Sequence, residues 1–166
     1  MSDCLDLSPA RMRQALGRYA TGVTVVTAAG AQGPIGMTVN SFASVSLDPP
    51  LVLWSLRRAS LLHAEFIARP AFAVHVLGAS HRHLARAFAQ TAEDRYAGLD
   101  WYPGHDGLPV FDDCVARFEC ATRQVLDAGD HAILIGQVLR LHLYDDEAGA
   151  LVFCNGAFST HGGMPA

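Results

Sequence analysis

The stretch that decides the fold runs from Ile35 to Ser60, IGMTVNSFASVSLDPPLVLWSLRRAS. Successive side chains of a strand point to opposite faces of its sheet. If the first half of the stretch is interpreted as one long strand from Ile35 to Leu47, its odd-numbered positions are apolar apart from Ser41 and form a face for a core. The even-numbered positions are small or polar around one aromatic ring: Gly36, Thr38, Asn40, Phe42, Ser44 and Ser46.

The polar face of this strand contains no charged residue, whereas a solvated strand usually carries Lys and Glu. Short hydroxyl and amide groups donate and accept hydrogen bonds without charge. A row of them suits a planar ligand with carbonyl and amide edges, or the oxygens of a phosphate. An ordinary half-exposed antiparallel strand is the alternative, and this pattern leaves it open.

The second half of the stretch predicts a buried strand that leads into a helix. Pro49 and Pro50 interrupt the first strand because proline has no backbone N–H, and Leu51 to Leu56 then reads as apolar. Ser60 is a candidate N-cap for a helix to about residue 68. A helix N-terminus beside Arg57 and Arg58 predicts a phosphate site. The alternative is a capped helix with two solvated arginines.

Composition places the chain among globular proteins with a large core. The 166 residues are 51% hydrophobic and 17% charged, with a net charge of −4, and predict a single domain over residues 1–166. The absence of a basic patch argues against nucleic acid, and no apolar run approaches a membrane span. No secretory signal is evident. Four scattered cysteines without a C-x-x-C motif favour reduced thiols in the cytoplasm.

Elements outside the central stretch are mostly strands. A helix is expected from Ser8-Pro9 to Gly22, with the apolar side chains of Met12, Ala15, Leu16 and Tyr19 on one side. The sequence predicts strands over Val23–Ala28 and Phe72–Leu77. A further helix begins at Ser80, and its His81-x-His83 pair is interpreted as part of a solvated face without a metal, since no acidic or cysteine partner is near in sequence.

The second half of the chain predicts long hairpins. Residues 91–113 are irregular, as in a lid or binding loop, or in ordinary packing of a long connection. Two β-rich runs, Cys114 to Asp127 and His131 to Tyr144, are joined tightly. A turn at Asp145–Gly149 precedes a last strand from Leu151 to Phe158. The expected fold is mostly β with short helices, an antiparallel sheet closed into a small barrel.

Six segments in this order resemble the short-chain flavin reductase family, whose members serve two-component monooxygenases. They are YATGVTVVT (19–27), GMTVNSFASVSLDPPLV (36–52), RRAS (57–60), FAVHVL (72–77), HLARAFA (83–89) and GDHAILIGQV (129–138). The resemblance covers nearly the whole chain. It implies an FMN-binding split β-barrel, antiparallel and Greek-key-like, in a homodimer with flavin near the subunit interface.

The resemblance also implies site residues. The flavin-binding positions would be Thr38, Val39, Asn40, Ser41, Ser44, Ser46, Trp54, Ser55, Leu56, Arg57, Arg58 and Ser60. His131 would lie near the reduced nicotinamide, with Asp130 orienting its turn or its imidazole, although a histidine bonded to the backbone of a hairpin turn is the alternative. Two departures from the family are His75, where many relatives carry Asn, and Phe158, which replaces a Gly-Arg-Tyr segment and offers only a stacking face.

The implied activity is hydride transfer from NADH or NADPH to FMN or FAD, which supplies reduced flavin to a partner monooxygenase. Such chemistry resides in the flavin, in keeping with a sequence without a catalytic triad, paired carboxylates, a metal cluster or a G-x-G-x-x-G motif. A flavin-binding electron-transfer or storage protein on the same barrel is the alternative. A pyridoxine phosphate oxidase would need more basic residues, and a haem-handling barrel would need clustered histidines.

Overall fold

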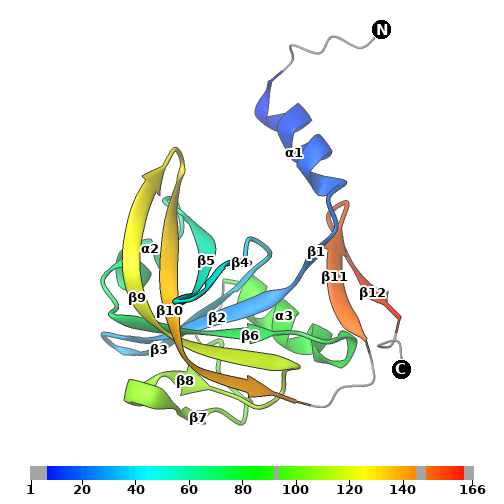
Figure 1. The fold of residues 1–166 in the computed structure, drawn as a ribbon. Coiled ribbons are helices and arrows are strands. Elements are labelled where there is room, and N and C mark those ends of the chain that lie inside the picture. The colour runs from blue at the N-terminus through cyan, green and yellow to red at the C-terminus, as the bar shows by residue number, and fades with distance from the viewer. Residues whose placement is uncertain (1–6, 92–93, 145–148, 163–166) are drawn as a thin grey trace, which may run out of the picture.

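A seven-stranded antiparallel sheet forms the centre of the computed structural model, which describes residues 7–91, 94–144 and 149–162 (Figure 1). The strands follow the order β3-β2-β6-β9-β10-β5-β4, and each adjacent pair is antiparallel. Their bounds are β2 (Thr24–Gly30), β3 (Gly33–Val39), β4 (Ala43–Leu47), β5 (Pro50–Arg57), β6 (Ala71–Val76), β9 (Ala116–Ala128) and β10 (His131–Leu143).

Smaller elements surround this sheet. A three-stranded sheet of order β1-β11-β12 and a two-stranded β7-β8 sheet add to it. The bounds of these strands are β1 (Thr21–Gly22), β7 (Tyr102–Pro103), β8 (Pro109–Val110), β11 (Ala150–Cys154) and β12 (Ala157–His161). The helices are α1 (Pro9–Gly17), α2 (His63–Ile67) and α3 (Arg82–Ala89), with 3-10 turns η1 (Ala79–His81) and η2 (His105–Gly107). The prediction of a mostly β chain is confirmed.

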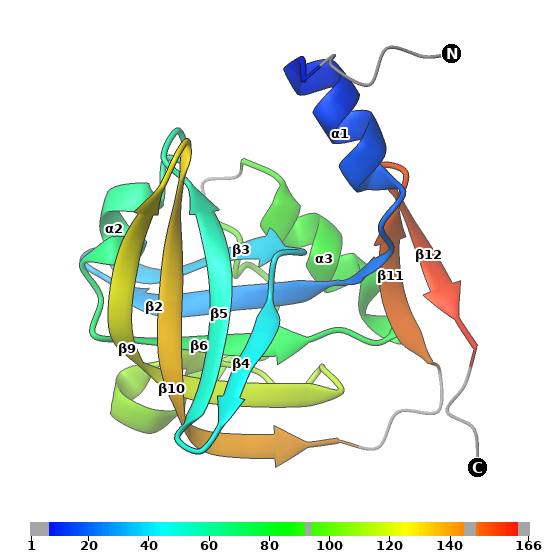
Figure 2. The ribbon, with the colours of Figure 1, turned by 45° about the horizontal axis from the view of Figure 1, so that its top comes forward.

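The barrel is split between β3 and β4, which follow one another in the chain but lie at opposite edges of the sheet. The predicted single strand from Ile35 to Leu47 is therefore wrong. At the break, the Ser41 hydroxyl accepts from Ser55 N at 2.9 Å and donates to Ser55 O at 3.2 Å. One side chain thus takes the place of a backbone ladder, and the chain crosses from one edge to the other (Figures 1 and 2).

The break also changes which side chains face the core. Beyond it, Val45 and Leu47 are 46% and 94% exposed, although they belong to the set predicted for the core. Phe42, which was assigned to the polar face, packs against Phe118 with ring centroids 5.5 Å apart. Even in β3 the two faces are not core and polar as predicted, since Gly36 is buried and Ile35 and Met37 are only partly buried.

Strand β5 shows the alternation that the sequence predicts. Trp54 and Leu56 are fully buried in the core, where the Trp54 ring lies 5.1 Å from Phe66 and 5.9 Å from Phe72, both edge to face. Side chains on the other face of β5, Ser55 and Arg57, line a pocket instead. Alternate side chains of β5 therefore face the core and the pocket.

The two outer helices differ from their predicted bounds. Ser8 caps α1 as expected, its hydroxyl accepting from Arg11 N at 3.4 Å, but the helix ends at Gly17 and not at Gly22. None of its described residues is buried, because the helix stands away from the sheets (Figure 1). Helix α2 begins at His63, and Ser60 accepts from Leu62 N at 3.3 Å within the preceding turn, so the predicted helix cap at Ser60 is wrong. The phosphate site predicted beside Arg57 and Arg58 stays a prediction.

The C-terminal region is a hairpin and not the single predicted strand. Asn155 and Gly156 turn the chain with φ angles of 50° and 77°, the left-handed pair that a two-residue hairpin requires. The predicted turn at Asp145–Gly149 lies outside the described residues except for Gly149. Residues 91–113 contain β7, η2 and β8, so this stretch is less irregular than expected.

The His81-x-His83 pair has an acidic partner that the sequence did not indicate. Asp113 lies 3.1 Å from Nε2 of His81 and 3.0 Å from Nε2 of His83, and His81 is buried. Its Nδ1 accepts from Gly78 N at 3.0 Å, so its proton is on Nε2. Among the described residues, no group of histidine, cysteine and acidic side chains has the arrangement of a metal site. No described helix has the length and hydropathy of a transmembrane segment.

Candidate functional site

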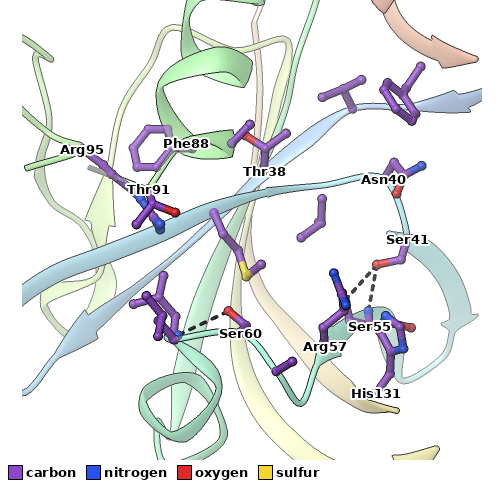
Figure 3. A pocket seen from close by; sticks show the side chains of 18 of the residues that line it. Thr38, Asn40, Ser41, Ser55, Arg57, Ser60, Phe88, Thr91, Arg95 and His131 are labelled. Atoms are coloured by element: carbon purple, nitrogen blue, oxygen red, sulfur yellow. Dashed lines mark hydrogen bonds between the residues drawn. The ribbon is translucent and has the colours of Figure 1, made fainter. Parts of the chain in front are cut away.

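A pocket of about 600 Å³ lies beside β3 and the exposed face of β5 (Figure 3). Such a volume is within the range of small-molecule sites. Its wall also includes the turn after β5, the end of α3, and phenylalanines of the β11-β12 hairpin. The lining residues are Val23, Met37, Thr38, Val39, Asn40, Ser41, Ser55, Arg57, Ala59, Ser60, Leu61, Leu62, Phe88, Ala89, Thr91, Arg95, His131, Phe153 and Phe158.

Small uncharged polar groups line the middle of this pocket. Thr38, Asn40, Ser41, Ser55 and Ser60 all contribute to it. Two are fixed by their own bonds: the Thr38 hydroxyl donates to Ala85 O of α3 at 2.7 Å, and Ser41 holds the backbone of Ser55. The wall can therefore offer hydrogen bonds to a planar ligand without large rearrangement.

Positive charge occupies two ends of the pocket, and no Asp or Glu is among its described lining residues. Arg57 lies beside His131 at one end, and Arg95 lies beside Phe88 and Thr91 at the other (Figure 3). An uncharged middle between two guanidinium groups suits a ligand that combines a polar ring with an anionic tail.

His131 enters the pocket from the start of β10, with Asp130 behind it. Nδ1 of His131 lies 2.7 Å from Oδ1 of Asp130. This hydrogen bond and the charge of His131 lower the pKa of Asp130, so the carboxylate is ionised at neutral pH and accepts the Nδ1 proton. Nε2 is then the ring nitrogen left to act on a ligand. The predicted alternative, a bond from His131 to the turn backbone, is not what the structure has.

Five predicted binding residues do not line the pocket. Trp54 and Leu56 point into the core. Ser44 and Ser46 lie on β4, beyond the break in the predicted long strand. Arg58 is held by the β9-β10 turn, where it bonds Gly129 O at 3.2 Å and pairs with Asp127 at 2.6 Å. The other predicted binding residues, Thr38, Val39, Asn40, Ser41, Ser55, Arg57, Ser60 and Phe158, come together at the pocket.

Arg95 and Phe88 belong to the pocket although the sequence analysis did not assign them. Phe88 packs closely over β3 because position 36 is glycine: a Cβ there would lie 2.6 Å from its ring. The Tyr96 hydroxyl donates to Ile35 O, and Arg95 donates to Gly36 O, both at 2.7 Å. These contacts fix the start of the 91–113 stretch against β3. The stretch was expected to cover a ligand, but no pattern singled out Arg95.

The geometry of this pocket can be compared with known proteins. The family model for the flavin reductase like domain matches residues 16–162. The chain belongs to the flavin reductase like domain family. The resemblance seen in the sequence is therefore confirmed, and the split sheet with its pocket is the form that this family takes in the present chain.

Relatives of this chain are reductases of flavins or of flavin-dependent monooxygenase systems. The FMN reductase (NADH) SmoA of Agrobacterium fabrum is 50% identical over 146 residues, 88% of this chain and 82% of that protein. The reductase component of the flavin-dependent trigonelline monooxygenase of Acinetobacter baylyi is 45% identical over 128 residues, 76% of this chain but only 41% of that protein. The chain thus spans less than half of the second relative.

A solved structure of the same fold contains pieces of both expected ligands. It is the NADH:FAD oxidoreductase SgcE6 of Streptomyces globisporus in complex with NAD and FAD fragments. The two chains superpose with a TM-score of 0.86 at 38% identity, and 93% of each chain is covered. The split-barrel fold class is thereby confirmed.

Proposed function

We propose that this protein is an NAD(P)H-dependent flavin reductase that transfers hydride from NADH or NADPH to FMN or FAD. The observation that carries the proposal is the pocket, in which uncharged polar side chains lie between Arg57 and Arg95, with His131 at one end. The similarity to the FMN reductase (NADH) SmoA and the NADH:FAD oxidoreductase SgcE6 supports the same reaction.

The residues of the pocket fit a flavin. A bound flavin supplies the ring that accepts the hydride, while the protein orients the reactants. Thr38, Asn40 and Ser55 are placed to bond the polar edge of the ring, and the guanidinium group of Arg95 to bond the anionic tail. Phe158 adds an apolar face. His131, held by Asp130, is placed to position the nicotinamide through Nε2.

The physiological role that we propose is supply of reduced flavin to a partner monooxygenase. The Acinetobacter relative, which is the reductase component of a flavin-dependent monooxygenase, supports this role. A homodimer forms part of this proposal. Leu16 and Tyr19 are 63% and 76% exposed on or just after α1, which stands away from the sheets, and Leu7 before it is 75% exposed. A second copy is a natural cover for such apolar side chains. We propose a cytoplasmic location.

The decisive test is the absorbance of NADH or NADPH at 340 nm with purified protein and added FMN or FAD. Loss of absorbance that requires added flavin is the expected result, and the four pairings rank both substrates. Protein that binds flavin but oxidises neither nucleotide would contradict the proposal and favour an electron-transfer or storage protein.

Asn40→Leu is expected to weaken flavin binding by about 1–3 kcal/mol, because a polar group of the ring edge loses its partner. Asn40 is exposed and lies at the pocket, so the substitution leaves the core intact. Quenching of flavin fluorescence measures the dissociation constant. Ser44→Leu, on β4 outside the pocket, is the matched control and should leave flavin affinity unchanged. Equal affinities for both variants would exclude Asn40 from the site.

His131→Ala is expected to lower kcat/KM for NADH about 10- to 100-fold, since a misplaced nicotinamide loses reactive geometry. Flavin affinity should change much less. Asp130→Asn is the matched control: its amide oxygen still accepts the Nδ1 proton, so most of the rate should remain. Stopped-flow measurement of the reduction of bound flavin gives the rate constant for hydride transfer separately from the affinity for NADH. A parallel loss of flavin affinity and rate in His131→Ala would count against a role toward the nicotinamide.

A further inference from the structure

A second cavity of about 440 Å³ adjoins the flavin pocket. The two cavities share four wall residues, Leu61, Leu62, Thr91 and Arg95. The far wall of the second cavity is formed by the β2-β3 turn and the start of β3, residues 31–36, together with Glu65 of α2 and Asp94. Nothing in the proposed binding of a flavin ring uses this space, and it continues the pocket from the Arg95 end.

Arg95 lies at the boundary between the two cavities, and its guanidinium group has hydrogen-bond donors that are available to a ligand. One of its terminal nitrogens donates to Gly36 O at 2.7 Å, which fixes the guanidinium in place. Its Nε is buried without a hydrogen-bond partner in the described part of the chain. A buried unpaired donor is costly, and the planar guanidinium matches two phosphate oxygens at once. The structure therefore offers a diphosphate position between the two cavities.

The charge of the second cavity is opposite to that of its boundary. Glu65 accepts from Ala31 N at 3.1 Å and pairs with Arg69 at 3.3 Å, while Asp94 accepts from Tyr96 N at 2.9 Å, so both carboxylates are held in place. A terminal phosphate would be repelled here. Ribose hydroxyls, in contrast, donate well to carboxylates, as in dinucleotide sites of other folds. Leu61, 83% exposed, supplies an apolar surface for a base.

We propose that the second cavity binds the adenosine of a dinucleotide whose diphosphate lies on Arg95. The proposal rests on the proposed function, because the reacting rings at the His131 end leave the rest of the ligand at the Arg95 end (Figure 3). Both FAD and NADH contain this adenosine diphosphate portion. The chemistry of the cavity is the same for the two sources, and the experiment separates them.

Ala31→Trp fills the second cavity from an exposed position of the β2-β3 turn, and Ala31→Ser is its matched control. Gln32→Trp, from the neighbouring exposed position, is a second blocking variant in case the first does not fold. Flavin fluorescence gives dissociation constants for riboflavin, FMN and FAD. Steady-state kinetics with FMN give KM for NADH and for reduced nicotinamide mononucleotide, which lacks the adenylate.

If the adenosine belongs to FAD, wild-type protein binds FAD about tenfold more tightly than FMN, a difference of about 1.4 kcal/mol, and Ala31→Trp abolishes this advantage. If it belongs to NADH, Ala31→Trp abolishes instead the KM advantage of NADH over the mononucleotide. The proposal is overturned if flavins bind and are reduced while neither ratio changes. A wild-type protein that reduces no flavin would contradict the proposed function itself, which is a different result.

Arg95→Met tests the boundary separately. The riboflavin-to-FMN gain in affinity measures the contribution of one phosphate, and we expect this gain to shrink about tenfold in the variant. The riboflavin constant serves as the internal control for folding of the ring site. If the diphosphate belongs to NADH, the variant should instead raise KM for NADH with little change in KM for the mononucleotide. Only an unchanged gain together with an unchanged KM for NADH would remove Arg95 from the phosphate position and overturn the proposed path between the cavities.

Discussion

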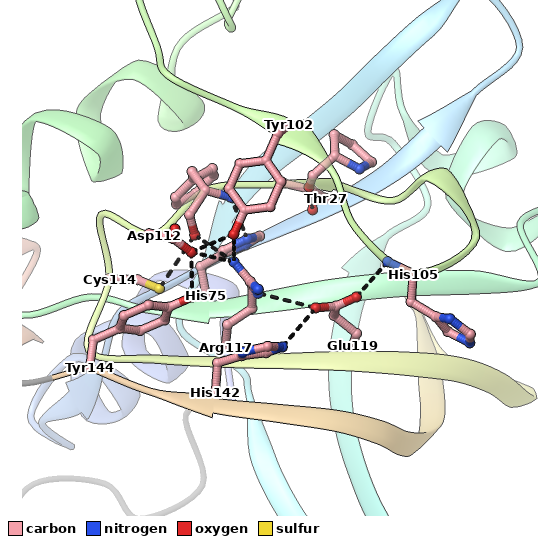
Figure 4. Close-up of polar contacts among 12 residues, drawn as sticks. Thr27, His75, Tyr102, His105, Asp112, Cys114, Arg117, Glu119, His142 and Tyr144 are labelled. Carbon is pink, nitrogen blue, oxygen red and sulfur yellow. Dashed lines mark hydrogen bonds and ion pairs between the residues drawn. The ribbon is translucent and has the colours of Figure 1, made fainter.

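Replacing Arg117 with methionine is expected to lower the free energy of unfolding by about 3–5 kcal/mol. The Arg117 side chain is 4% exposed, with NH1 at 2.7 Å from Asp112 and Nε at 3.2 Å from Glu119, which is itself only 2% exposed (Figure 4). The guanidinium also lies over the rings of Tyr102 and Tyr144, 5.5 and 5.8 Å from their centroids. Removing it leaves a buried carboxylate without its cation, which is why the expected loss is large.

Chemical denaturation at pH 7 measures this loss. The double variant Arg117→Met, Glu119→Leu is the control, because it also removes the stranded carboxylate and should recover part of the stability. His105 N, which donates to Glu119 at 2.7 Å, limits that recovery. A loss below about 1 kcal/mol in Arg117→Met would mean that the carboxylates find other partners, or water, without the arginine.

Acidification is expected to destabilise the protein through His75, with an effect of as much as about 4 kcal/mol at pH 3. Burial, helped by the nearby charge of Arg117, lowers the pKa of His75 to about 3, although the bond to Val25 O and the charge of Asp112 act to raise it. Between pH 6.5 and 3 the unfolded chain therefore binds a proton that the folded protein does not, so stability falls as pH falls. Each pKa unit corresponds to about 1.4 kcal/mol.

Both ring nitrogens of the neutral His75 form hydrogen bonds to the backbone. Nδ1 donates to Val25 O at 3.2 Å, Nε2 accepts from Phe111 N at 3.4 Å, and the ring stacks on Phe111 with centroids 3.8 Å apart. Protonation would remove the acceptor from Phe111 and place a charge near Arg117. His75→Asn is the control variant: it keeps a donor toward Val25 but does not titrate.

Unfolding free energies measured from pH 7 to pH 3.5 test this expectation. The fall for wild type should exceed the fall for His75→Asn by an amount that grows as the pH decreases. Carboxylates such as Asp112 titrate in both proteins, so their contribution cancels in the difference. Parallel curves for the two proteins would show that His75 takes up its proton in the folded state.

The sequence predicted the fold class and most of the site because both depend on local patterns. Hairpins of the β9-β10 kind follow from alternation and turn residues, and the uncharged polar side chains at and just after the end of β3, Thr38, Asn40 and Ser41, marked one wall of the pocket. The resemblance to flavin reductases added the roles of His131 and Asp130. Their contact at 2.7 Å agrees with that interpretation, while their roles stay predictions.

Long-range contacts explain what the sequence could not predict. Nothing in the run from Ile35 to Leu47 indicates that Ser41 would replace a backbone ladder and end the strand. No local pattern singled out Arg117 and Glu119, because only folding brings Asp112 and the 102–112 segment over them. The position of Arg95 in the pocket could likewise not be predicted, since it depends on the contacts that Arg95 and Tyr96 make with the backbone of β3.

The hairpin of β11 and β12 bears on how the protein is made. It supplies Phe153 and Phe158 to the pocket and pairs through β11 with β1, at the opposite end of the described chain. A ribosome releases the strands of the seven-stranded sheet before this hairpin. The barrel can therefore assemble during synthesis, but a nascent chain gains its complete binding site only after its last strands have emerged.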